Sequence, residues 1–161
     1  MLNKLKILFL NILIFLELMD KVAEILRIKP IEVYEVVSFY TMYNQRPVGK
    51  YMFEFCQTSP CCLNGVEDLM DYTCEKLGVK VGEPTADGLF EVRGVECLGA
   101  CVNAPMMQIN DDYYEDLDKE ITLEIFDKIL NGEIPKPGSY RGRKNNEPEN
   151  NRKTLMDLKN A

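Results

Sequence analysis

The sequence predicts an α+β fold in which one small domain is preceded by a short N-terminal helical segment. The pattern of residues 50–95 predicts a strand, a helix and a second strand. A pair of strands and a last helix follow, and they end by residue 132. The chain has 161 residues, 46% of them hydrophobic, which is enough to bury the core of one domain. We therefore expect a helical segment over residues 1–44, the α+β domain over 45–132 and an extended tail over 133–161.

The first 44 residues should be mainly helical. Asp20 can cap a helix over residues 21–27, and Pro30 suits the start of a second helix. The apolar face of that second helix comprises Val33, Tyr34, Val37, Phe39 and Tyr40. The apolar stretch 7–16 is short for a transmembrane helix, which needs roughly 20 residues, and no small-residue cleavage site follows it. We interpret this stretch as a buried or partner-facing helix; a targeting or membrane-contacting segment and a mis-assigned start are the alternatives.

The βαβ unit is predicted from three consecutive patterns. Residues 50–56 have the composition of a strand, residues 64–77 suit a helix that ends at Gly78, and residues 89–95 suit a second strand. The apolar stripe of the helix comprises Val66, Leu69, Met70, Cys74 and Leu77. The helical crossover should be right-handed, and the two strands that it joins should be parallel.

A hairpin and a capped helix should complete the domain. Residues 106–109 and 113–117 flank Asn110-Asp111-Asp112, which favours a hairpin turn. Asp118 can cap a helix that carries apolar residues at helical spacing and stops at Asn131-Gly132. This order of elements is close to that of a thioredoxin-like sheet.

Composition excludes several classes of function. The chain has no histidine, so it cannot by itself build a Ser-His-Asp or Cys-His catalytic site, a mixed cysteine-histidine zinc finger, a His-ligated haem or a Rieske centre. The formal net charge of −7 argues against a nucleic-acid partner. A G-x-G-x-x-G dinucleotide fingerprint does not occur. We therefore expect no catalytic residue and no activity of the chain on its own.

Cysteines are the chemistry-bearing residues of the chain. There are six, and four of them form two close pairs, Cys56 with Cys61 and Cys97 with Cys101. Each pair follows one of the two parallel strands, and parallel strands end on the same side of a sheet, so the two loops should meet. Four such thiolates can bind a 2Fe-2S cluster or zinc, or can form disulfides or stay free. The spacing favours the cluster and leaves the other possibilities open.

The second cysteine loop has a distinctive sequence. The run Val95-Glu96-Cys97-Leu98-Gly99-Ala100-Cys101-Val102-Asn103-Ala104-Pro105, followed by residues 108–114, closely resembles the 24 kDa-type iron-sulfur subunit of respiratory complex I. This family comprises the flavoprotein 2 or E-type components of NADH:quinone oxidoreductase. The same likeness extends to residues 33–36, 39–44, 47–51 and 134–138, and it covers about residues 19–138.

The resemblance implies an electron-transfer subunit with a thioredoxin-like domain. Its one 2Fe-2S cluster would be held by Cys56, Cys61, Cys97 and Cys101, which match the family's motif. Its partners would be the subunit that binds FMN and NADH and neighbouring subunits of the peripheral arm. The chain would meet the membrane only through the complex, on the cytoplasmic face of a bacterial inner membrane or the matrix face of a mitochondrial one.

Two other functions also fit the sequence. The diaphorase module of an NAD-linked hydrogenase or formate dehydrogenase has a matching subunit that shares the motif. A module that zinc or thiols stabilise, with no redox role, belongs to a different class of function.

The chain departs from the family pattern in three places. Apolar residues 1–18 replace a longer N-terminal helical region. Cys62 offers a competing ligand directly after Cys61, although the pairing of Pro60 with Cys61 matches the family and favours Cys61. Cys74 lies on the apolar stripe of its helix, so we expect it to be a small buried hydrophobic residue rather than a ligand.

Overall fold

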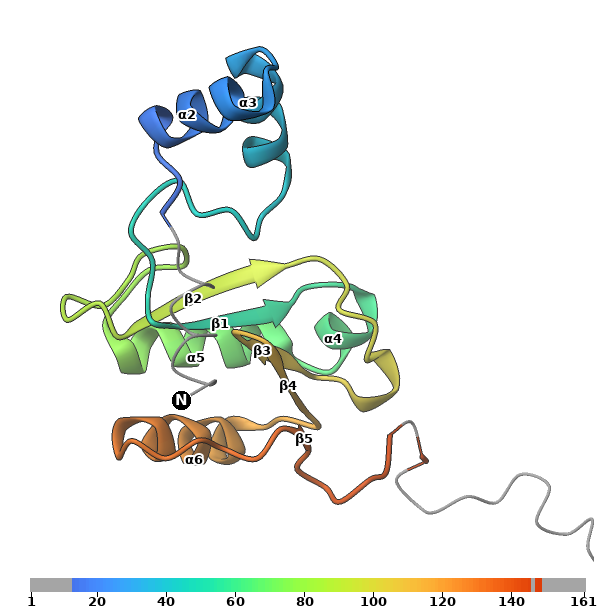
Figure 1. Cartoon of the computed structure of the whole chain (residues 1–161). Coiled ribbons are helices and arrows are strands. Elements are labelled where there is room, and N and C mark those ends of the chain that lie inside the picture. Colours follow the sequence, from blue (N-terminus) through green and yellow to red (C-terminus); the bar gives the residue numbers. More distant parts are fainter. Residues whose placement is uncertain (1–12, 146, 149–161) are drawn as a thin grey trace, which may run out of the picture.

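The structure is a computed structural model that describes residues 13–145, 147 and 148 (Figure 1). The expectations for residues 1–12 and for residues 149–161 of the tail lie outside these described residues. The described chain forms an α+β domain preceded by a pair of helices, which confirms the predicted fold class. None of its helices combines the length and the apolar character needed to cross a membrane.

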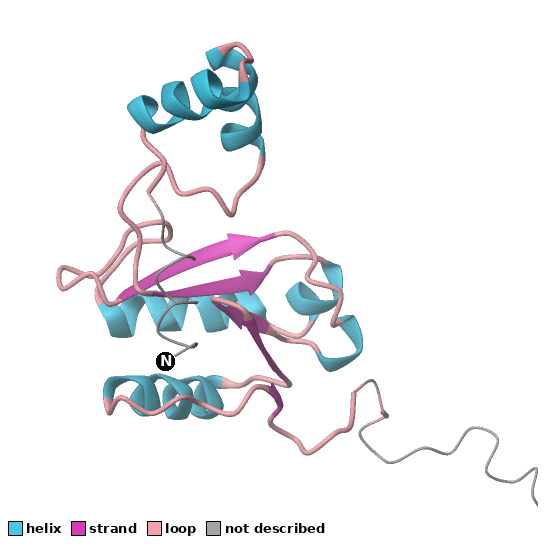
Figure 2. Ribbon diagram, viewed as in Figure 1, coloured by secondary structure: helices cyan, strands magenta, loops and turns pink. Residues whose placement is uncertain are grey.

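A five-stranded mixed sheet forms the centre of the α+β domain. Its strands are β1 (Tyr51–Cys56), β2 (Phe90–Val95), β3 (Met107–Ile109), β4 (Asp112–Glu115) and β5 (Gly138–Ser139). Their order across the sheet is β2-β1-β3-β4-β5 (Figure 2). β1 and β2 run parallel with Cys56 opposite Val95, which confirms the predicted pair. β3 runs antiparallel to β1 and to β4, and Asn110 adopts a φ of 55° in the turn of the predicted hairpin.

Helices α5 (Val66–Leu77) and α6 (Lys119–Leu130) lie on the same face of the sheet (Figures 1 and 2). Both follow the predicted end signals. Gly78 ends α5 in the left-handed conformation with a φ of 65°, and the Asp118 side chain accepts a hydrogen bond of 2.8 Å from the Ile121 amide at the start of α6. The ring of Phe126 on α6 lies 4.9 Å from that of Phe90, centre to centre, so the helix packs directly on β2.

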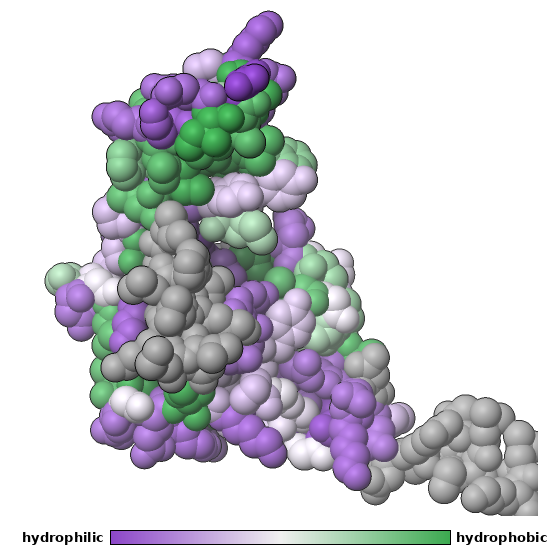
Figure 3. All heavy atoms as spheres, viewed as in Figure 1, coloured by the Kyte–Doolittle hydropathy of each residue, from purple (hydrophilic) through white to green (hydrophobic). Residues whose placement is uncertain are grey.

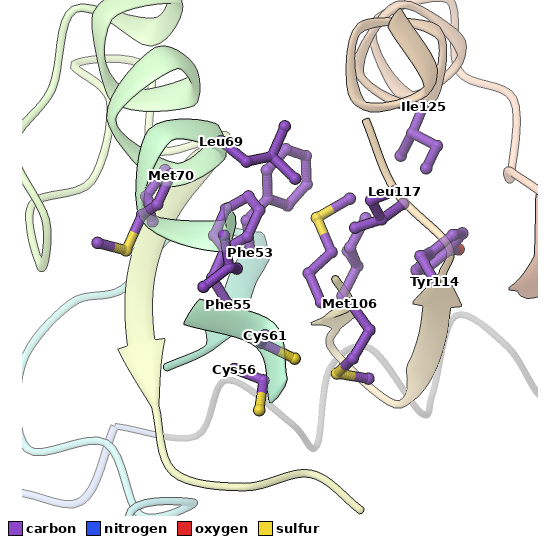
Figure 4. Close-up of a cluster of buried hydrophobic side chains, with 14 of the residues drawn as sticks. Phe53, Phe55, Cys56, Cys61, Leu69, Met70, Met106, Tyr114, Leu117 and Ile125 are labelled. Carbon is purple, nitrogen blue, oxygen red and sulfur yellow. The ribbon is translucent and has the colours of Figure 1, made fainter. Parts of the chain in front are cut away.

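The core lies between this face of the sheet and the two helices. Figure 4 shows side chains from β1, α5 and α6 pointing toward one another, and Phe53, Phe55 and Ile125 are fully buried. Side chains alternate between the two faces of a strand, so Glu91, between Phe90 and Val92, points to the opposite face. Glu91 is nevertheless fully buried.

Helices α2 (Leu16–Leu26) and α3 (Pro30–Phe39) form a separate pair before the sheet. They share a small core of their own that comprises Met19, Ala23, Val33 and Val37. Pro30 opens α3 as predicted. The predicted cap was wrong, because α2 begins at Leu16 and Asp20 lies one turn inside it. The carbonyl of Phe15 accepts the amides of Leu18 and Met19 and so sets the start of the helix.

The apolar face predicted for α3 is only partly buried. Val33 and Val37 are buried, whereas Tyr34, Phe39 and Tyr40 are exposed, Phe39 by 77%. Hydrophobic side chains gather over the helix pair (Figure 3). The reason is that α3 packs on α2 through a single narrow stripe and leaves the rest of its apolar surface uncovered.

The first part of the tail pairs with the sheet. Gly138–Ser139 form strand β5, which pairs in parallel with Tyr114 and Glu115 of β4. The hydroxyl of Tyr114 donates a hydrogen bond to the Pro135 carbonyl at 3.3 Å. The chain after α6 is therefore tied to the sheet up to residue 140 at least.

Candidate metal centre

The two cysteine loops leave the sheet side by side. Cys56 is the last residue of β1, and the amide of the next residue, Gln57, donates a hydrogen bond of 2.9 Å to the carbonyl of Val95, the last residue of β2. The second loop starts directly after Val95. The parallel pairing of β1 and β2 thus brings the loops together at one edge of the sheet, as the sequence predicts.

The first loop contains a short helix that sequence reasoning missed. α4 (Ser59–Leu63) begins directly after Thr58 with Pro60 in its first turn, and it carries Cys61 inward. The residues Cys56 and Cys61 are 2% and 1% exposed, and Figure 4 shows them side by side at the margin of the core. With only five residues, α4 is too short to show helical periodicity in the sequence.

The second loop presents its two cysteines at the surface. Cys97 and Cys101 are exposed, and their sulfur atoms lie 3.6 Å apart. Gly99 between them has a φ of 83°, a conformation that side chains with a Cβ rarely adopt. The Tyr113 hydroxyl donates a hydrogen bond of 2.9 Å to the Leu98 carbonyl and so ties this loop to β4. A 3-10 turn, η1 (Cys101–Asn103), follows.

Thr58 connects the two loops. Its hydroxyl lies 3.3 Å from the Cys56 sulfur, and after the Gly99 amide it is the next group that lowers the pKa of Cys97. Burial raises the pKa of Cys56, but hydrogen bonds from Thr58 and from the Leu98 amide outweigh this effect, so the pKa is lowered overall. Sequence reasoning missed Thr58; a hydroxyl residue two positions after the first cysteine was the available signal.

Each pair contains one thiol whose pKa is lowered. In the second loop, the Gly99 amide lowers the pKa of Cys97, and Cys101 lowers it further. The partner thiols shift the other way: burial, aided by Cys56, raises the pKa of Cys61 to about 12, and the hydrogen bond with Cys97 raises the pKa of Cys101. Cys56 and Cys97 are therefore the more readily ionised members of their pairs. The ionised form, the thiolate, is the form of cysteine that binds metals.

The remaining two cysteines lie apart from this arrangement. The thiol of Cys62 donates to the Gln57 carbonyl at 3.3 Å and lies 3.8 Å from a Glu67 carboxylate oxygen. Loss of solvation, followed by the Glu67 carboxylate, raises the pKa of this thiol. Cys74 is partly buried and packs against the main core, in keeping with a hydrophobic role. Burial, followed by Asp71, raises its pKa.

The spacing of the thiols can be compared with that of metal ligands. A single tetrahedral metal with metal–sulfur bonds of about 2.3 Å brings all four sulfurs within about 4 Å of one another. The residues that the structure describes contain no group of three or more cysteines and carboxylates close enough to hold one metal ion. The Cys97–Cys101 distance of 3.6 Å fits two ligands on one metal. The two thiols of the second loop are therefore close enough to bind the same metal ion.

Comparison with known proteins supports this description. The family described as thioredoxin-like 2Fe-2S ferredoxin matches residues 11–130. The chain is 46% identical over 144 residues to NADH dehydrogenase (ubiquinone) flavoprotein 2, mitochondrial, of Dictyostelium discoideum, a match that covers 89% of this chain and 58% of that protein. It is 51% identical over 112 residues to an NADH-quinone oxidoreductase subunit of Rickettsia conorii, covering 70% of this chain and 67% of the relative.

A solved structure shares the fold. The NAD+-reducing NiFe-hydrogenase in its air-oxidised state superposes with a TM-score of 0.65 and 25% sequence identity, over 74% of this chain and 21% of the hydrogenase chain. The present chain thus spans about a fifth of that chain and about three fifths of the Dictyostelium relative. The family match over residues 11–130 and the paired cysteine loops agree, and the chain belongs to the thioredoxin-like 2Fe-2S ferredoxin family.

Proposed function

We propose that the chain is an electron-transfer subunit of NADH:quinone oxidoreductase that holds one 2Fe-2S cluster through Cys56, Cys61, Cys97 and Cys101. The observation that carries the proposal is the meeting of the two cysteine pairs at the carboxyl ends of β1 and β2. Relatives that are 46% and 51% identical bear the names of subunits of this enzyme. As an enzyme component, the chain would act only within the complex.

The donor set fits this cofactor. Iron in such clusters is held by cysteine thiolates, two for each iron, and the chain supplies two pairs. When bound, a 2Fe-2S cluster accepts and returns single electrons. The described residues perform the supporting tasks: Thr58 and the Leu98 amide stabilise the Cys56 thiolate, and the Gly99 amide stabilises that of Cys97. Hydrogen bonds to ligand sulfurs raise the reduction potential of such a centre.

The partners follow from the same proposal. The exposed second loop is the part of the site that a neighbouring subunit can approach, because Cys97 and Cys101 are exposed whereas Cys56 and Cys61 are buried. We place the subunit that binds FMN and NADH against this loop. The complex would lie at the cytoplasmic face of a bacterial inner membrane or the matrix face of a mitochondrial one, with this chain in its peripheral arm.

The second candidate function is that of a subunit in the diaphorase module of a hydrogenase. The likeness to NAD+-reducing NiFe-hydrogenase also fits the diaphorase module of a hydrogenase. The higher identity to the relatives named as NADH dehydrogenase subunits favours the first proposal. Purification of the native complex and identification of its subunits would decide, because a hydrogenase subunit in place of quinone-linked subunits would contradict the first proposal.

The ligand assignment can be tested by electron paramagnetic resonance of the dithionite-reduced protein. Changing Cys56, Cys61, Cys97 or Cys101 to Ser should abolish or distort the signal, while Cys74→Ser should leave it unchanged as the matched control. Iron and acid-labile sulfide should both be present in anaerobically purified protein. A full wild-type signal from Cys97→Ser, or zinc in place of iron and sulfide, would overturn the proposal.

A further inference from the structure

The C-terminal tail returns to the second cysteine loop. After α6, Ser139 of β5 pairs with Glu115 of β4, and the Tyr140 amide donates to the Glu115 carbonyl at 3.1 Å. This pairing directs residues 141–145 toward the backbone that follows Cys101. The sequence predicts an extended tail over residues 133–161, so the return of this part to the domain is a finding of the structure.

Asp116 forms a buried ion pair with the tail. Its side chain is 1% exposed, and that of Arg143 is 11% exposed. The Asp116 carboxylate accepts hydrogen bonds from Ser139 Oγ at 2.5 Å and from Arg143 Nε at 3.0 Å, and Arg143 Nη2 donates to its other oxygen. A two-pronged arginine–carboxylate contact of this kind fixes direction as well as distance.

The same pair holds the backbone directly after Cys101. Arg143 Nη1 donates to the Val102 carbonyl at 3.1 Å, and the Asp116 amide donates to the Asn103 carbonyl at 2.8 Å. The Asn103 side chain in turn donates to the Asn145 carbonyl at 2.9 Å. The two residues that follow Cys101 are therefore bound by Asp116 and by the tail.

We propose that Arg143, seated on Asp116, is a positioning residue that fixes the second cysteine loop and so sets where Cys101 presents its thiolate to the cluster. This rests on the proposed function, because it requires Cys101 to be a ligand. The cysteine itself is exposed and begins a single 3-10 turn, so little packing of its own holds it in place. The ion pair of Arg143 and Asp116 restrains the loop beside it. Residues that support the ligands of a metal centre commonly orient those ligands in this way.

The test compares reconstituted full-length wild-type protein with Arg143→Gln and with the matched control Lys144→Gln, which removes the same charge from an exposed neighbour. Loss of iron to a chelator should be about 10- to 100-fold faster in Arg143→Gln than in the control, in line with the usual effect of removing such a supporting contact. The reduced-state resonance spectrum should shift in g-values. Arg143→Lys keeps the charge but loses the fork, so it should restore the wild-type behaviour only partly.

Truncation provides a second test that does not depend on one side chain. A chain that ends at Gly142 keeps β5 and lacks Arg143, whereas a chain that ends at Pro148 keeps every contact described above. The first should behave like Arg143→Gln and the second like the wild type. Equal iron loss and identical spectra for Arg143→Gln and Lys144→Gln would overturn the proposal.

Amide hydrogen exchange in the cluster-free protein separates this proposal from the proposed function. The Asp116 amide, bonded to the Asn103 carbonyl, should exchange faster in Arg143→Gln than in Lys144→Gln. If wild-type protein binds no iron and sulfide, the proposed function fails, and faster exchange still supports the fixing of the loop. If the wild-type protein does bind a cluster but the Asp116 amide exchanges equally fast in cluster-free Arg143→Gln and Lys144→Gln, only the positioning role is overturned.

Discussion

Arg46 and Glu91 form an ion pair at the junction between the helix pair and the sheet. Arg46 Nη2 lies 2.6 Å from Glu91 Oε1, and the Glu91 side chain is fully buried. The carboxylate also accepts hydrogen bonds from Arg93 Nε at 2.6 Å and from the Gly49 amide at 3.0 Å. A buried carboxylate with this many donors is stabilised in its charged form. The segment from α3 to β1 is thereby fixed to β2.

We predict that Glu91→Gln destabilises the protein by about 1–3 kcal/mol, the cost of leaving buried donors poorly paired. The amide cannot accept from all three donors as the carboxylate does. The free energy of unfolding from urea titration measures the effect. Glu124→Gln is the matched control, because its pair with Lys128 lies on the surface of α6, and it should leave the midpoint unchanged. Equal midpoints for the two variants would contradict the prediction.

The same carboxylate should make stability depend on pH. Burial raises the pKa of Glu91, but hydrogen bonds from Arg46 and Arg93 outweigh it and lower the pKa below 4.5. A group whose pKa is lower in the folded state contributes stability above its unfolded pKa and loses it as the pH falls through the folded value. The stability difference between wild type and Glu91→Gln should therefore be constant above about pH 5.5 and shrink below pH 4.5.

Glu91 and Glu54 should change the stability at acid pH in opposite directions. Burial raises the pKa of Glu54, which lies on the same network through Arg93, so protonation of Glu54 stabilises rather than destabilises the folded state. Urea titrations at several pH values, carried out on wild type, Glu91→Gln and Glu54→Gln, would separate the two contributions. A stability difference between wild type and Glu91→Gln that grows on acidification would show that Glu91 is not charged in the folded protein.

Local signals in the sequence predicted most of the α+β domain. Gly78 and Asp118 act within one turn of their helices, and the turn at Asn110 joins adjacent strands, so each can be recognised without knowledge of distant residues. The meeting of the cysteine loops could also be predicted, because the two strands of a βαβ unit are parallel and so end on the same side of the sheet. The placement of Cys56 and Cys97 near one another is a consequence of that rule.

The contacts that sequence reasoning missed are those between distant residues. Glu91 pairs with Arg46, which lies 45 positions away in the sequence, and Asp116 pairs with Arg143, which lies 27 positions away. No periodicity in the sequence links such partners. A charged residue in the middle of an apolar strand was the available signal for Glu91. Strand β5 has only two residues and exists through its pairing with β4, so its own composition could not reveal it.

The first cysteine loop allows a sharp test of register. We predict that Cys61→Ser removes the cluster signal and that Cys62→Ser leaves it, because Cys61 is buried beside Cys56 whereas the Cys62 thiol points to the Gln57 carbonyl and Glu67. Resonance spectra of the reduced variants, normalised to protein, would measure this. The opposite result would show that the ligand of this loop lies one residue later.

The helix pair should serve assembly rather than the cluster. Its core of Met19, Ala23, Val33 and Val37 is separate from the main core, so deletion of residues 1–44 should leave the cluster signal and the main unfolding transition in place. The deletion keeps Arg46 on Glu91. We expect it to weaken binding to partner subunits, since a large exposed apolar surface is typical of an interface. Co-purification with those subunits is the measurement.

A point variant makes this test more specific. Phe39 is 77% exposed, so Phe39→Asp should reduce co-purification without changing the unfolding midpoint, whereas Glu24→Gln on the exposed side of α2 should change neither. Loss of both cluster and fold on deletion of residues 1–44 would show instead that the helices belong to the folding unit of the main domain.

The last prediction is that NADH does not reduce this polypeptide in the absence of a flavoprotein. NADH gives up a hydride, which carries two electrons, and the proposed centre takes single electrons. The chain has no G-x-G-x-x-G fingerprint and no histidine for acid–base work. Visible absorption of the reconstituted protein should therefore stay that of the oxidised form after NADH is added, while dithionite bleaches it.

Addition of the subunit that binds FMN should change this result. The flavin converts a hydride into single electrons, so part of the absorption should then bleach, to an extent set by the cluster's potential relative to the nicotinamide couple. A variant that lacks Cys97 controls for absorption changes of the flavin itself. Rapid and complete bleaching by NADH in a preparation shown to contain no flavin would mean that the chain binds the nucleotide directly, and the assignment as an electron-transfer subunit that depends on its partner would then be wrong.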